Sequence, residues 1–185
     1  MPKLKPFTLK QLTLTAMAAA VAVVAEVFEV PFPPPFAFLK LNLADVPAIL
    51  AAMTVSPLSG FLVVVLRCLI HMFRTTTIFV GETVNIVIGF GMVYGFCFVK
   101  YKRKGGERHY ALAAVAGTVC TILFGYAANI CFFPMYAAMF SMNIGSFTDY
   151  LINTITAMNA VRGAITFAFT ALLIPAVKPL KRMLS

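Results

Sequence analysis

The sequence predicts an all-α membrane protein of six transmembrane helices, forming a single domain over residues 1–185. Hydrophobic residues make up 61% of the chain and charged residues only 11%, whereas a soluble domain is usually about 45–50% apolar. The apolar residues also form long runs, and the chain has room for five or six spans of about 20 residues each. No room is left for a separate soluble domain.

Three clusters of basic residues orient the predicted helices. They lie before the first apolar run, in one loop near the middle of the chain and at the C-terminal end (Lys3, Lys5 and Lys10; Lys100, Lys102, Arg103, Lys104 and Arg108; Lys178, Lys181 and Arg182). A net charge of +9 would suggest nucleic acid as the partner of a soluble protein. Basic clusters at alternate ends of membrane spans instead mark cytoplasmic segments. We therefore expect cytoplasmic termini, a membrane-lipid environment and no nucleic-acid partner.

The helices follow from the breaks between apolar runs. The first covers about residues 9–30 and stops at the proline-rich segment 31–35, which cannot continue a helix. The others cover about residues 46–56, 58–73, 83–99, 110–133 and 150–177. Two cytoplasmic termini require an even number of spans, so six spans fit and five do not. Cleavage of the first run as a signal peptide would break this parity.

The second predicted segment is unusually short. Its 11 residues cannot cross a hydrocarbon core of about 30 Å as a straight helix. Either the helix extends back toward Asp45 or the segment is partly re-entrant, and the sequence leaves both alternatives open.

Polar residues concentrate on the predicted extracytoplasmic side, in segments 31–45, 72–82 and 139–151. On the sixth helix, Asn159 and Arg162 are three residues apart and therefore share a face. Arg162 lies near mid-membrane, where an arginine costs about 2.5–3.5 kcal/mol on insertion scales. Its guanidinium must therefore face an internal cavity or a carboxylate.

Two interpretations of these polar residues stay open. Polar groups in the outer halves of several segments favour a small-molecule pocket open to the outside. The predicted lining of this pocket is Lys40, Asn42, Asp45, Thr76, Glu82, Asn85, Asn129, Asn159 and Arg162. Alternatively, Arg162 forms a structural ion pair with Asp45 or Glu82, and the asparagines link neighbouring helices.

The sequence predicts neither an enzyme nor a metal site. His71 and His109 are the only histidines, and the predicted topology places them on opposite sides of the membrane. The four cysteines lie in apolar runs without metal-ligand spacing. Metalloprotease, serine-hydrolase and phosphate-loop motifs are also absent. We expect no cofactor, and any ATP hydrolysis must belong to partner subunits.

Five strings, in the same order along nearly the whole chain, resemble one known family. They are Phe38-Leu-Lys-Leu-Asn-Leu-Ala-Asp-Val-Pro47, Pro57-Leu-Ser-Gly60, Thr75-Thr-Thr-Ile-Phe-Val-Gly-Glu-Thr-Val-Asn85, Asn129 with Phe133-Pro-Met-Tyr136, and Asn159-Ala-Val-Arg-Gly163. The first is similar to the string Leu-Lys-Leu-Asp-Phe-Ser-Asp-Ile-Pro of that family. The family comprises the substrate-binding S components of energy-coupling factor (ECF) vitamin transporters, and the resemblance is greatest to its riboflavin-binding branch.

The resemblance implies a multi-pass subunit of a prokaryotic cell membrane that takes a vitamin, riboflavin or a related flavin, from outside. The first loop would be an extracytoplasmic lid over the vitamin. Ala16 and Ala20 on the first helix would dock to a transmembrane coupling protein, which is carried by two cytoplasmic ATPases. Together these subunits form an ABC-type importer.

Departures from the branch's pattern leave the vitamin open. Asn42 stands where the branch has aspartate, and Arg67 and Arg162 stand where lysines are usual. These changes make the predicted pocket more positive, and arginine suits a carboxylate or phosphate better than lysine does. Anionic pantothenate is therefore an alternative to riboflavin. A different class of function is also open, namely a membrane subunit that binds no ligand and has a structural or assembly role.

Overall fold

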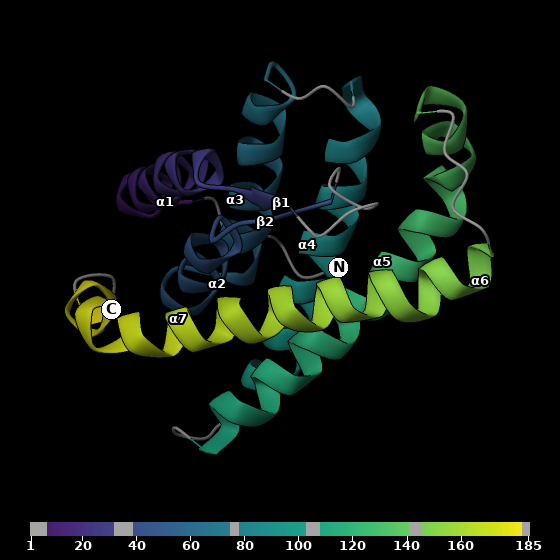
Figure 1. Cartoon of the computed structure of the whole chain (residues 1–185). Coiled ribbons are helices and arrows are strands. Elements are labelled where there is room, and N and C mark those ends of the chain that lie inside the picture. Colours follow the sequence, from purple (N-terminus) through teal and green to yellow (C-terminus); the bar gives the residue numbers. More distant parts are fainter. Residues whose placement is uncertain (1–6, 32–38, 75–77, 103–107, 141–145, 183–185) are drawn as a thin grey trace, which may run out of the picture.

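The structure is a computed structural model that describes residues 7–31, 39–74, 78–102, 108–140 and 146–182. Within these residues, the main helices are α1 (Leu9–Val27), α2 (Asp45–Thr54), α3 (Pro57–His71), α4 (Ile78–Lys102), α5 (Arg108–Phe140) and α7 (Thr156–Arg182). The short helix α6 (Phe147–Asp149) and a π-helical segment, η1 (Tyr150–Ile155), lead directly into α7. The predicted all-α fold with six main helices is confirmed (Figure 1).

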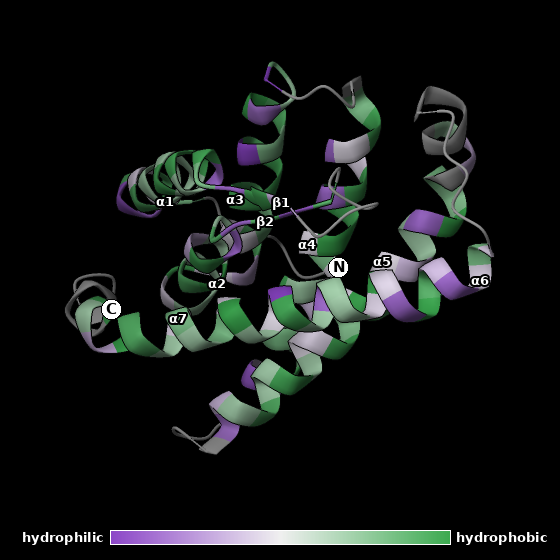
Figure 2. Cartoon of the chain, viewed as in Figure 1, coloured by the Kyte–Doolittle hydropathy of each residue, from purple (hydrophilic) through white to green (hydrophobic). Residues whose placement is uncertain are grey.

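Four helices in the described part of the chain are long and apolar enough to cross a membrane: Leu9–Val27, Phe79–Lys102, His109–Phe132 and Phe147–Val177. Figure 2 shows hydrophobic residues along most of α1 and along the C-terminal half of α7, whereas hydrophilic residues gather where α6 and η1 lead into α7. The chain is therefore a multi-pass membrane protein, as predicted.

The helices α2 and α3 are shorter than the other four. The ten residues of α2 span only about 15 Å at 1.5 Å per residue. The helix begins at Asp45, one residue before the predicted start, and ends at Thr54, so it is no longer than the predicted segment. It ends before Ser56, whose side chain accepts a hydrogen bond from the backbone N–H of Ser59 and caps α3, with Pro57 as the first residue of α3.

The helix α2 lies in the apolar core and packs against α1, α3 and α7. Its small residues permit close helix approach. A Cβ atom on Gly60 of α3 would lie 2.7 Å from the Cβ of Ala52 and 2.9 Å from the carbonyl oxygen of Ala48, so only glycine fits at this crossing. The core also contains Ala22 of α1 and Phe96 of α4.

Pairs of small residues on α1 and α4 have opposite surroundings. Gly91 and Gly95 of α4 face α5, because a Cβ atom on either would lie within 3 Å of α5 atoms. This pair is therefore used for packing inside the subunit. In contrast, Ala16 and Ala20 are exposed on α1, while Ala19 of the same helix is buried in the core.

A two-residue β-pair follows α1 and precedes α2. Its strands, β1 (Val30–Pro31) and β2 (Lys40–Leu41), are antiparallel, with Val30 opposite Leu41. The side chain of Lys40 forms a salt bridge of 2.5 Å with Glu29. This hairpin holds the two described ends of the loop predicted to be a lid, but the role of the loop stays a prediction.

Candidate functional site

The centre of the candidate site is the carboxylate of Asp45, the first residue of α2. This residue is 1% exposed, and each of its oxygens accepts a hydrogen bond from an arginine. Arg67 of α3 donates from Nη2 to Oδ1 at 2.6 Å, and Arg162 of α7 donates from Nε to Oδ2 at 2.5 Å. Buried charges are tolerated when they are paired and hydrogen-bonded in this way. The contact therefore joins three helices.

The two arginines extend this network to two more helices. Arg67 donates from Nη1 to Oε1 of Glu26 on α1 at 3.1 Å, and Arg162 donates from Nη1 to Oδ1 of Asn85 on α4 at 3.1 Å. We call Glu26, Arg67, Asp45, Arg162 and Asn85 the charge network. Because its members come from five helices, its geometry depends on the whole bundle.

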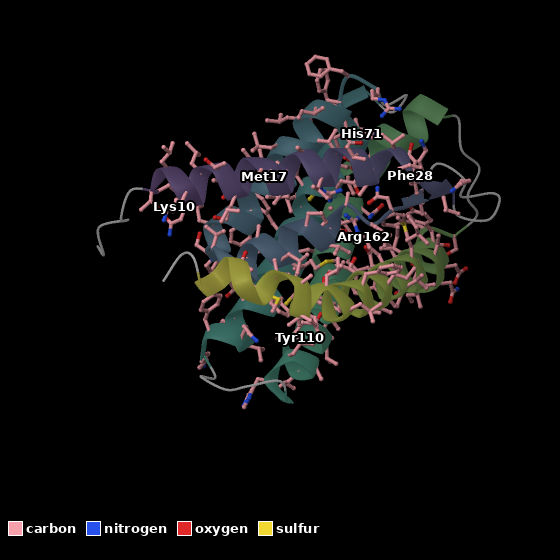
Figure 3. All side chains as sticks on the ribbon, turned by 90° about the vertical axis from the view of Figure 1, so that its left-hand side faces the viewer. Lys10, Met17, Phe28, His71, Tyr110 and Arg162 are labelled. Carbon is pink, nitrogen blue, oxygen red and sulfur yellow. The ribbon has the colours of Figure 1, made fainter. Side chains whose placement is uncertain are left out.

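The charge network lies at one end of α1. Figure 3 shows His71 and Arg162 toward the Phe28 end of α1 and away from its Lys10 end. The same end carries a second polar contact, in which Nδ1 of His71 lies 2.8 Å from Oε1 of Glu82. Of the two carboxylates that the sequence offered as a partner for Arg162, the structure selects Asp45, whereas Glu82 pairs with His71.

Two predicted site residues, Asn129 and Asn159, both lie against Gly125 of α5. Asn129 of α5 donates to the carbonyl oxygen of Gly125 at 2.8 Å and accepts from the Tyr150 hydroxyl at 3.1 Å. A Cβ atom on Gly125 would lie 2.6 Å from Nδ2 of Asn159, so the glycine makes room for that amide. Asn159 donates to the carbonyl oxygen of Ile155 at 2.9 Å.

The side-chain oxygen of Asn159 is unsatisfied. This Oδ1 atom is buried and has no hydrogen-bond partner among the described residues. Since a buried acceptor without a donor costs about 1–3 kcal/mol, such an atom is a candidate contact for a substrate hydrogen-bond donor. Asn159 and Arg162 lie three residues apart on α7, which puts this acceptor on the same helix face as the charge network.

Other predicted site residues lie outside this group. Lys40 is exposed on β2, and the side chain of Asn42 accepts a hydrogen bond from the backbone N–H of Ala44 at 3.1 Å, just before α2. Thr76 lies outside the described residues. The structure thus brings together Asp45, Asn85 and Arg162 directly, with Asn159 on the same helix as Arg162.

Four residues that complete these contacts were absent from the predicted lining: Glu26, Arg67, His71 and Tyr150. Of these, only Arg67 was expected to add positive charge to the predicted pocket. Glu26 and Arg67 did carry a signal, because each is a charge inside an apolar helix and opposite charges there are expected to pair. His71 and Tyr150 carried none, since their partners are set by how the helices cross.

A bundle of apolar helices joined by a buried polar network defines a multi-pass membrane protein. A family model for the substrate-specific component of ECF transporters matches residues 10–177. The chain belongs to this family, as its sequence strings indicated. The members of this family are transporter subunits rather than enzymes.

Curated relatives span most of the chain. The riboflavin transporter FmnP of Bacillus subtilis (strain 168) is 24% identical over 179 residues, which cover 92% of this chain and 93% of the relative. The riboflavin transporter RibU of Staphylococcus aureus (strain TCH60) is 26% identical over 161 residues, which cover 84% of each chain. These relatives support membership of the family.

A solved S component of a bacterial ECF transporter has the same fold. It matches this structure with a TM-score of 0.80 at 20% sequence identity, covering 92% of this chain and 96% of that one. The bundle described above is therefore an S-component fold.

Proposed function

We propose that this chain is the vitamin-binding S component of an ECF-type importer and that its substrate is riboflavin or a related flavin. The curated relatives named as riboflavin transporters match it over most of its length. The sequence alone left anionic pantothenate as an alternative, because Arg67 and Arg162 add positive charge to the predicted pocket.

The pairing of the two arginines is the observation that favours a neutral substrate. Asp45 binds both guanidiniums, and Glu26 binds Arg67 as well. Two carboxylates therefore balance two guanidiniums, so an anionic vitamin would bring an unbalanced negative charge into this buried network. A substrate that offers hydrogen bonds without a charge avoids the cost of burying that charge.

The proposed binding surface combines Asn85, Asn129, Asn159 and Arg162, with Asp45 holding Arg162 in place. The free Oδ1 of Asn159 would accept a hydrogen bond from the substrate. Lys40 and Asn42 would contribute from the loop that precedes α2, and Thr76 and Glu82 from the region where α4 begins.

In this proposal, energy for uptake comes from partners. A transmembrane coupling protein would dock on the exposed face of α1 that contains Ala16 and Ala20, and two ATPases would hydrolyse ATP on the cytoplasmic side. The chain itself would need no cofactor. Both termini would be cytoplasmic, and the charge network, which lies away from the Lys10 end of α1, would then be in the outer half of the bundle.

The test is a comparison of vitamins on the untagged protein in detergent. Mass spectrometry of small molecules released on denaturation should detect a flavin. Added riboflavin should raise the melting temperature, since a ligand that binds only the folded state stabilises it by mass action. Stabilisation by pantothenate but not riboflavin would support the anionic alternative. No response to any vitamin would favour the structural or assembly subunit.

A further inference from the structure

We propose that Glu26, His71 and Glu82 form a binding site for a divalent transition-metal ion, represented here by Zn²⁺. These residues come from α1, α3 and α4, and each offers one ligand atom within 4.8 Å of the other two. The sequence predicted no metal site because its two histidines are far apart. The present site needs only one histidine, with two carboxylates supplied by other helices.

Unpartnered carboxylate oxygens point to a ligand at this site. Glu26 and Glu82 are each 2% exposed. Each has one oxygen engaged, since Oε1 of Glu26 accepts from Arg67 and Oε1 of Glu82 contacts His71. The Oε2 atoms of both residues are buried and lack a hydrogen-bond partner among the described residues. Buried carboxylate oxygens without a donor or a metal ion are unfavourable, because burial removes their hydration.

The donors of His71 cannot match both carboxylate oxygens. Glu26, Glu82 and Asp45 are three acidic groups, and the charge network contains two arginines. Nδ1 of His71 already contacts Glu82, so only Nε2 of the ring is left as a further donor, whereas two carboxylate oxygens lack a donor. A metal ion can bind both carboxylates and the imidazole together.

The ligand set favours zinc over calcium. Imidazole nitrogen and carboxylate oxygen bind Zn²⁺ at about 2.0–2.2 Å in tetrahedral geometry, so neighbouring ligand atoms lie about 3.3–3.6 Å apart. The three ligand atoms, which lie within 4.8 Å of one another, would therefore move together by up to about 1.5 Å when the ion binds. Calcium prefers an all-oxygen shell of six to eight ligands, which these residues do not supply. The His71 side chain is 12% exposed, so an ion could enter the site past this residue.

Such an ion would connect the C-terminal end of α1, the C-terminal end of α3 and the beginning of α4. It would stabilise these helix ends beside the charge network, because Glu26 belongs to both groups. This inference does not depend on which vitamin the protein binds.

The experiment uses the full-length protein in detergent, with its purification tag removed so that His71 and His109 are the only histidines present. Chelator-treated protein is titrated with ZnCl₂ by calorimetry, and its metal content is measured after gel filtration. We expect one Zn²⁺ per chain and a higher melting temperature with Zn²⁺ than with the same concentration of Ca²⁺. His71→Ala and Glu82→Gln should each weaken Zn²⁺ binding by at least about tenfold.

His109→Ala is the matched control, because it removes the other histidine of the chain and should leave zinc affinity unchanged. Melting temperatures measured without metal identify any variant that has lost its fold. The proposal is overturned if folded wild-type protein binds no stoichiometric zinc, or if folded His71→Ala and Glu82→Gln bind it as tightly as the wild type.

Discussion

Arg162 donates a hydrogen bond from Nε to Oδ2 of Asp45 at 2.5 Å, across 117 residues of sequence. The contact ties the beginning of α2 to α7, and Arg67 holds the other oxygen of the same carboxylate. Arg162 also donates to Asn85 of α4. This one side chain therefore has a structural role, which the geometry shows, and a proposed role in substrate binding.

Replacement of Arg162 by alanine should destabilise the protein by about 3–5 kcal/mol, because it leaves the buried Asp45 carboxylate with only one of its two cations. Arg162→Lys should destabilise the protein less than Arg162→Ala does, since the positive charge remains and only the hydrogen bond to Asn85 is lost. Denaturant unfolding of both variants in detergent measures the difference. A fully stable Arg162→Ala protein would contradict the structural role.

Asn159→Ala should weaken riboflavin binding by about 5- to 30-fold, the equivalent of about 1–2 kcal/mol for one lost hydrogen bond. Stability should fall as well, because the side chain is fully buried and packs against Gly125 of α5, so its truncation leaves a cavity. The melting temperature of the variant separates this loss of stability from the loss of affinity. Fluorescence titration with riboflavin gives the affinity.

Asn153→Ala is the control for this prediction, since Asn153 is an exposed asparagine six residues earlier on the segment that leads into α7. It should bind riboflavin as the wild type does. Equal affinities of the two variants would remove Asn159 from the proposed site.

Ala16→Trp should abolish vitamin uptake in cells while the isolated subunit still binds its ligand. A large ring at this exposed position would prevent close helix approach to a coupling protein. Val21→Trp, at an exposed position on a different face of α1, should retain uptake. Loss of ligand binding in Ala16→Trp would contradict a pure docking role.

Gly60→Ala should destabilise the bundle by about 1–3 kcal/mol through overpacking, because the new Cβ would lie 2.7 Å from the Cβ of Ala52. Ala52→Gly removes that neighbour, so the double variant should regain part of the stability lost in Gly60→Ala. The double variant should still be less stable than the wild type, because the Cβ at position 60 would lie 2.9 Å from the carbonyl oxygen of Ala48. Thermal unfolding of the four proteins tests this coupling, and additive effects of the two substitutions would contradict it.

The predicted topology can be tested with single cysteines in a cysteine-free background. A membrane-impermeant thiol reagent applied to intact cells should label a cysteine at position 143 and not one at position 104. This expectation rests on the basic clusters, since basic loops remain on the cytoplasmic side. The opposite labelling pattern would reverse the orientation of every helix.

The sequence by itself determined the membrane class, the six main helices and several of their limits, because these depend on local properties. Apolar runs fit lipid, and prolines mark two of the helix ends, since residues 31–35 follow α1 and Pro57 is the first residue of α3. Ordered strings along the chain also identified the family. The predicted end of α5, near residue 133, is too early, because the helix continues through Pro134 to Phe140. A membrane helix can contain a proline when neighbouring groups satisfy the backbone carbonyl that the proline leaves without a donor.

Only the tertiary structure decided which charges meet. Asp45 and Glu82 were equally acceptable partners for Arg162 in the sequence, since both carry a carboxylate in the same predicted region. The crossing of α2 with α7 brings Asp45 to Arg162, while α3 and α4 bring His71 to Glu82. Ion pairing requires atoms within a few ångströms, and that distance is set by how the helices pack, which no local pattern encodes.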